Sequence, residues 1–100
     1  MHNISSLQDL NNYLSSEPEV LVDFWAEWCK PCKAILPLLE QLELASNIKI
    51  VKVDVSTLPE ISNKFKIRSI PTLILFKKGV IINQHTGSIS YQELLKFTQS

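Results

Sequence analysis

The stretch VLVDFWAEWCKPCK, residues 20–33, places both cysteines of the chain directly after a run of apolar residues. The run is β-branched and aromatic, which is typical of a strand that is buried on both faces of a sheet. Beyond the cysteines, apolar side chains recur at helical spacing, at Ile35, Leu38, Leu39 and Leu42. The stretch therefore predicts a buried strand whose carboxyl end leads, through Cys29, into a helix.

The composition is that of an ordinary globular protein. The chain has 100 residues, of which 45% are apolar and 20% charged. We expect residues 1–100 to form a single domain, because this length suffices for one buried core. Ten basic and ten acidic side chains give a formal net charge of zero. This balance does not point to a nucleic acid or a membrane as partner, and we expect a monomer.

The first residues, MHNISSLQDLNNYL, lack the basic start and the apolar run of a secretory signal. No stretch approaches the length of a membrane span, and we expect a cytoplasmic protein. Structural disulfides are rare in that compartment. Two cysteines at C-x-x-C spacing there suggest metal binding or redox chemistry.

Helices and strands alternate along the rest of the chain. The expected helices cover residues 6–15, 34–45, 56–65 and a closing segment from the capping box of Ser90 and Glu93. The expected strands cover residues 2–4, 20–26, 48–55, 72–76 and 80–85. Pro37 should kink the second helix. The fold class is α/β: a central mixed sheet of four to five strands, helices on both faces, and a C-terminal hairpin plus helix.

The two cysteines lie where a helix begins. The positive end of a helix and its unpaired N–H groups favour a thiolate, which is the form that attacks disulfides. Cys32 follows Cys29 by about one helical turn, so the two can close a small disulfide ring, and Pro31 sets the first turn. In this interpretation Cys29 attacks a substrate disulfide. Cys32 then attacks the sulfur of Cys29 and releases the reduced substrate.

Two other roles for the cysteines stay open at this point. A structural zinc site needs four ligands, and the C-x-x-C motif supplies two. His2 and His85 are the other candidate ligands and form no second paired motif. The cysteines could also be inert core residues, since free Cys is often buried. We expect no metal, because a C-x-P-C motif at a strand–helix junction fits redox chemistry better.

Two long motifs cover much of the chain: VDFWAEWC-x-PCK over residues 22–33, and KIRSIPTLILFKKG over residues 66–79, before Thr86 and Gly87. Apart from Lys30, the first matches the active-site signature of the thioredoxin family and the second continues the match, so most of the chain resembles that family. The resemblance implies the thioredoxin fold. It also implies a thiol–disulfide oxidoreductase that reduces protein disulfides through a redox-active disulfide, without a bound cofactor.

The resemblance further implies roles at matching positions. Cys29 would be the exposed nucleophile and Cys32 the buried resolving thiol. Asp23 should have a raised pKa if it is buried, because burial disfavours its charged form; the alternative is an acid at an exposed strand edge. The family match favours a buried acceptor for the Cys32 proton, working through water. Lys52 would moderate the charge of Asp23.

A flat docking surface around the cysteines is also implied. Its expected members are Trp28, Lys30, Pro31, Ile70, Pro71 and Gly87. Few X–Pro bonds are cis, yet the resemblance implies a cis bond before Pro71. The backbone of Ile70 would pair with an extended substrate segment, and Gly87 would let a substrate backbone approach closely.

The resemblance implies electrons from NADPH through thioredoxin reductase. It implies protein substrates such as ribonucleotide reductase, peroxiredoxin or methionine sulfoxide reductase, and the sequence does not choose among them. Two alternatives stay open. One is a dedicated, less reducing thioredoxin-like oxidoreductase for one pathway, and the other is a redox-independent assembly or binding module.

Lys30 stands where the common family motif has Gly, and it predicts a shifted reduction potential. An ammonium beside Cys29 stabilises the thiolate and thus the reduced form, which makes the couple more oxidising. It should also favour acidic partners. We expect Lys30→Gly to have a more negative reduction potential than the parent chain in a redox titration. An unchanged or less negative potential contradicts the hypothesis.

Overall fold

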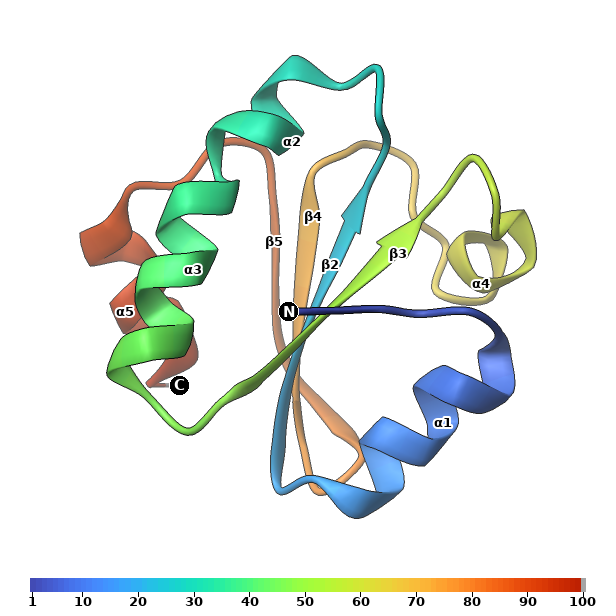
Figure 1. Ribbon diagram of the computed structural model, residues 1–100, viewed down its shortest axis with the longest axis horizontal. Helices are drawn as coiled ribbons and strands as arrows, with labels where there is room; N and C mark the ends of the chain where they lie inside the picture. The colour runs from blue at the N-terminus through green and yellow to red at the C-terminus, as the bar shows by residue number, and fades with distance from the viewer. Residues whose placement is uncertain (100) are drawn as a thin grey trace.

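A computed structural model describes residues 1–99 and shows a five-stranded sheet between two layers of helices (Figure 1). The strands are β1 (His2–Asn3), β2 (Glu19–Trp25), β3 (Lys49–Asp54), β4 (Thr72–Lys77) and β5 (Val80–Thr86). The helices are α1 (Leu7–Ser16), α2 (Lys30–Ala34), α3 (Leu36–Ala45), α4 (Pro59–Lys64) and α5 (Tyr91–Thr98). The predicted α/β class and the closing hairpin plus helix are confirmed.

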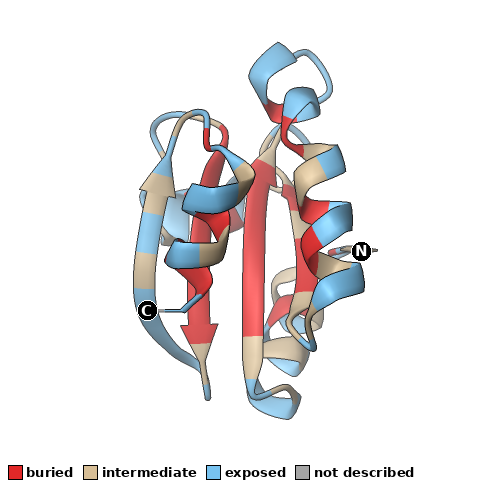
Figure 2. Cartoon of the chain, turned by 90° about the vertical axis from the view of Figure 1, so that its left-hand side faces the viewer, coloured by how far each residue is buried: buried red, intermediate tan, exposed pale blue. Residues whose placement is uncertain are grey.

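The sheet is mixed, as predicted. Its strand order is β1-β3-β2-β4-β5, with β2 in the middle. β3 pairs in parallel with β1 and β2, whereas β4 pairs antiparallel with β2 and β5. Buried residues gather in the middle strands and on the inner sides of the helices (Figure 2). Because β2 is the central strand, the chain exits from the middle of the sheet at the carboxyl end of β2.

Alternate residues of β2 pack against different helical layers. Val22 and Phe24 belong to a core cluster that includes residues of α1 and α4. Leu21 belongs to a second cluster with residues of α3 and α5. Because side chains alternate along a strand, Asp23 lies on the same face as Leu21. The carboxylate is therefore on the side of the sheet that α3 covers.

The predicted helix through Pro37 is divided in two. α2 ends at Ala34, α3 begins at Leu36, and Ile35 is the junction between them. Proline has no N–H to donate, and its ring clashes with the carbonyl four residues earlier, so Pro37 is tolerated in the first turn of a helix. The prediction of a kinked but continuous helix was wrong, and α2 is a short helix of its own.

The capping box of α5 yields a prediction about stability. The backbone N–H of Glu93 donates to the Ser90 hydroxyl (3.1 Å), and the backbone N–H of Ser90 donates to the Glu93 carboxylate (2.9 Å). We expect Ser90→Ala to destabilise the protein by about 1 kcal/mol, because the N-cap acceptor is lost. Urea unfolding measures the effect. Gln92→Ala, at an exposed position of α5, is the matched control. Equal urea midpoints for Ser90→Ala and the parent chain would contradict the prediction.

Candidate functional site

Cys29 and Cys32 form a disulfide at the point where β2 gives way to α2. Cys29 is the N-cap of α2, and its sulfur accepts a hydrogen bond from the backbone N–H of Cys32 at 3.2 Å. Pro31 occupies the first turn, where its missing N–H costs no hydrogen bond. The predicted pairing of the two cysteines is confirmed. The same N–H would stabilise negative charge on Cys29 once the disulfide is reduced.

Both sulfur-bearing residues are buried in this oxidised state. Cys29 exposes 5% of its surface and Cys32 exposes 1%. The expectation that Cys29 is exposed was wrong for the disulfide form, because both cysteines pack in a cluster with Ala26, against Trp25 and Ile70. The order of accessibility is nevertheless the one that a first attack at Cys29 requires.

Asp23 is fully buried in the middle of β2. Burial raises its pKa from 3.8 to about 7, and the positive charge of Lys52 offsets part of that rise. No protein group among residues 1–99 hydrogen-bonds either carboxylate oxygen. The alternative of an acid at an exposed strand edge is thus excluded. The carboxyl group can change protonation near neutral pH.

Lys52 lies beside Asp23 in the sheet, but its ammonium lies over the ring of a tryptophan. The two residues are register partners in the β2–β3 pair. The Nζ atom of Lys52 lies 4.0 Å from the centroid of the Trp25 ring, which is cation–π geometry. Sequence reasoning missed Trp25 as a site residue. The available signal was strand alternation, since Trp25 follows Asp23 by two positions.

Among the residues predicted to dock a substrate, Ile70 packs against the cluster of Cys29 and Cys32, and Pro71 is buried. Trp28 is 73% exposed, and its indole N–H donates to the Ser56 hydroxyl at 3.2 Å. A hollow of about 210 Å³ lies beside it, lined in part by Trp28, Arg68 and Ile70. The peptide bond between Ile70 and Pro71 is cis. The site therefore presents an exposed aromatic ring next to a shallow depression.

Gly87 joins this surface through the backbone. Its N–H donates to the carbonyl of Pro71 at 2.8 Å, and its φ of 98° is one that other residues rarely adopt. Apart from Gly87 and its two chain neighbours, no heavy atom of residues 1–99 lies within 4 Å of the place that a Cβ would take. The space in front of Gly87 is therefore open to an approaching chain.

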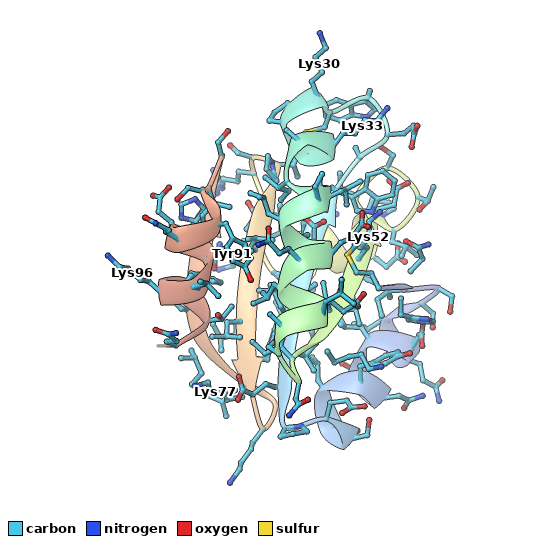
Figure 3. All side chains as sticks on the ribbon, turned by 60° about the vertical axis from the view of Figure 1, so that its left-hand side comes forward. Lys30, Lys33, Lys52, Lys77, Tyr91 and Lys96 are labelled. Atoms are coloured by element: carbon cyan, nitrogen blue, oxygen red, sulfur yellow. A yellow bond between two sulfur atoms is a disulfide. The ribbon has the colours of Figure 1, made fainter. Side chains whose placement is uncertain are left out.

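The two lysines of the motif behave differently. Lys30 is exposed and projects outward from the end of α2, away from the sheet (Figure 3). Lys33 forms an ion pair with Glu27 at 3.3 Å, in which both side chains are largely exposed. Lys30 is consequently the cation of the motif that is available to an arriving partner.

Within residues 1–99, no group of three His, Cys, Asp or Glu side chains could hold a metal ion. Cys29 and Cys32 are bonded to each other, and no third ligand joins them in this part of the chain. Among the helices of residues 1–99, none combines the length and the apolar composition that a membrane-spanning helix requires.

Asp23 should make stability depend on pH. Its folded pKa of about 7 exceeds the value of 3.8 for an exposed carboxyl, so the folded state binds more protons between these two values. Stability contributed by the protonated form is complete below about pH 4, falls as the pH rises through about 7, and levels off above. The total loss is about 4 kcal/mol.

Asp23→Asn removes this dependence. We expect the oxidised variant to be more stable than the parent chain at pH 9, by up to about 4 kcal/mol, with little difference at pH 4. Urea unfolding at both pH values measures the change. Glu40→Gln alters an exposed carboxylate on α3 and is the control. If the difference in unfolding free energy between the parent chain and Asp23→Asn is the same at both pH values, Asp23 does not titrate as predicted.

Comparisons with known proteins agree with this geometry. The thioredoxin family model matches residues 3–100. Thioredoxin C-2 of Corynebacterium nephridii is 49% identical over 86 residues, covering 84% of this chain and 80% of the relative. The thioredoxin of Mycobacterium tuberculosis is 47% identical over 85 residues, covering 83% and 73%.

Solved structures have the same fold. A mutant thioredoxin of Halobacterium salinarum has a TM-score of 0.94 at 26% identity, covering 98% of this chain and 87% of its own. A chain from a structure on the thiol-resolving mechanism in yeast mitochondrial 1-Cys peroxiredoxin has a TM-score of 0.92 at 28% identity, covering 99% and 93%. The chain therefore belongs to the thioredoxin family and is a thiol–disulfide oxidoreductase that reduces protein disulfides.

Proposed function

We propose that Cys29 is the nucleophile of the reaction. The thiolate of Cys29 attacks one sulfur of a substrate disulfide, a mixed disulfide forms, and the other substrate sulfur leaves as a thiol after taking up a proton. The observation that carries this assignment is the hydrogen bond from the Cys32 N–H to the Cys29 sulfur. The greater accessibility of Cys29 supports the same choice.

Cys32 resolves the mixed disulfide. Its thiol loses a proton to Asp23, through water, and the thiolate attacks the sulfur of Cys29. The second substrate sulfur leaves as a thiolate and takes up the proton that Asp23 releases, and the Cys29–Cys32 disulfide is regenerated, so two electrons and two protons have passed to the substrate. An acid with a pKa of about 7 suits this exchange of a proton at neutral pH. Lys52 limits how far burial raises that pKa.

The substrate docks as an extended segment across the exposed surface. Trp28 and the hollow beside it receive side chains, while the backbone next to the cis proline pairs with the segment as an added strand. The proposed contacts are Trp28, Lys30, Pro31, Ile70, Pro71 and Gly87. The open space at Gly87 accommodates the backbone of the partner.

The proposal extends to the electron supply and the partners. Thioredoxin reductase reduces the disulfide with electrons from NADPH, and the chain acts in the cytoplasm as a monomer of one domain, residues 1–100. Among substrates, a peroxiredoxin is supported by the yeast structure, whose subject is thiol resolution in such a protein through the glutathione and thioredoxin systems.

Two cysteine variants test the proposed order of events. We expect Cys29→Ser to reduce insulin at the background rate in the presence of dithiothreitol, because the nucleophile is missing and the remaining thiol, Cys32, is buried. We expect Cys32→Ser to form a stable mixed disulfide with substrate proteins, because the resolving thiol is missing. Gel shift and mass spectrometry after thiol blocking detect the trapped complex.

The trap also identifies the partners and has a built-in control. The double variant Cys29→Ser/Cys32→Ser should capture nothing. Insulin reduction that survives Cys29→Ser would overturn the assignment of the nucleophile. Trapping by Cys29→Ser instead of Cys32→Ser would show that the two roles are reversed.

A further inference from the structure

Asp23 and Lys52 start side by side across the β2–β3 pair. Their Cα atoms are register partners in parallel strands, and such strands lie about 4.8 Å apart. A buried carboxylate is ordinarily stabilised by hydrogen bonds or by pairing with a cation. A lysine that begins next to it would be expected to provide both.

The ammonium of Lys52 instead lies over the face of the Trp25 ring. The distance from Nζ to the ring centroid is 4.0 Å, well inside the limit of about 6 Å for cation–π attraction. No hydrogen bond from any protein group in residues 1–99 reaches the carboxylate of Asp23. By strand alternation, all three side chains lie on one face of the sheet. The ring and the carboxylate are thus alternative partners for one cation.

Trp25 contacts the Lys52 ammonium through the face of its ring and not through its indole N–H. The buried indole nitrogen has no hydrogen-bond partner among the protein groups of the described residues, although a buried indole N–H usually finds one. The ring packs against the cluster of Cys29 and Cys32, which fixes its place. Lys52 is half-buried, so an ammonium on the ring remains near water. Pairing with Asp23 would require the ammonium to lose its contact with water.

We propose that Trp25 is a positioning residue whose ring holds the Lys52 ammonium off Asp23 and leaves that carboxylate without a bonded counter-ion. The proposal deepens the proposed function, since it rests on Asp23 exchanging a proton with Cys32. A bonded ammonium would make Asp23 a stronger acid and therefore a poorer acceptor of that proton.

The groups around Asp23 leave Lys52 as the charge that matters. Lys52, on β3, is the one charged group that acts on the pKa of Asp23 among the residues described. On the other side, β4 places the apolar Leu73 at the facing register position. Toward α2, Cys29 and Cys32 are tied up in the disulfide and do not titrate. The position of one ammonium therefore controls the acidity of the carboxyl group.

The pKa of Asp23 in the oxidised protein tests the proposal. It is measured by NMR from the chemical shift of the side-chain carboxyl carbon as a function of pH. We expect Trp25→Leu to lower this pKa by about one unit or more, because the freed ammonium can approach the carboxylate. Trp25→Phe keeps a weaker cation-binding ring and should lower it less. An unchanged or higher pKa in Trp25→Leu overturns the proposal.

A second background separates the ammonium from simple hydration of the site. If the ring acts through Lys52, Trp25→Leu should have little effect on the pKa of Asp23 in a Lys52→Met protein. An equal decrease in both backgrounds would mean that water entry is the cause, and the proposal would be wrong. If Trp25→Leu does not fold, Trp25→Phe with and without Lys52→Met gives the same comparison.

The chain supplies a matched control and an independent readout. Lys49 lies on the same strand as Lys52, and its Nζ atom is 5.8 Å from the centroid of the Tyr13 ring. Tyr13→Leu removes that ring and should leave the pKa of Asp23 unchanged. The pH profile of mixed-disulfide resolution should move with the measured pKa in Trp25→Leu. If Asp23→Asn resolves as fast as the parent chain, the proton-acceptor role fails, whereas the pKa measurements still decide the role of Trp25.

Discussion

Five consecutive side chains of β2, residues 20–24, expose 1% or less of their surface. A strand with no face in water needs a helical layer on each side, which α1 and α4 provide on one face and α3 and α5 on the other. The chain must then leave the sheet at the carboxyl end of this strand. The first helix that it enters there carries the cysteine pair, so the place of the reactive sulfurs follows from the burial of the strand behind them.

The same burial sets the chemistry of Asp23. A carboxyl group surrounded by apolar neighbours holds its proton to a pH near 7. The nearby cation would cancel much of this effect if it bonded to the carboxylate directly. With the ammonium resting on Trp25, the site retains both a buried acid and a neighbouring positive charge. Burial raises the pKa of Asp23 and the charge of Lys52 lowers it, so that the pKa lies at about 7.

Strand features were predictable because they depend on local pattern. The continuous apolar run around Asp23 predicted a strand buried on both faces. The C-x-x-C spacing allowed a disulfide, and the resemblance to the family made it the expected state. The resemblance to the family, not the physics of the sequence, predicted the cis bond before Pro71. The residues that escaped prediction depend on three-dimensional packing. The choice of Lys52 between a ring and a carboxylate depends on residues of another strand. The burial of Cys29 in the disulfide form depends in part on Ile70, which is distant in the sequence.

The interruption at Ile35 separates two helices of different anchorage. α2 has five residues, and Cys32 is its buried member, whereas α3 inserts Leu39 and Leu42 into the core. The free energy of local opening rises with the buried contacts that are lost, so opening α2 alone costs less free energy than opening α3 or the sheet. The helix that carries the reactive sulfurs is therefore less firmly anchored than the frame behind it, and in the oxidised state the disulfide restrains its first turn.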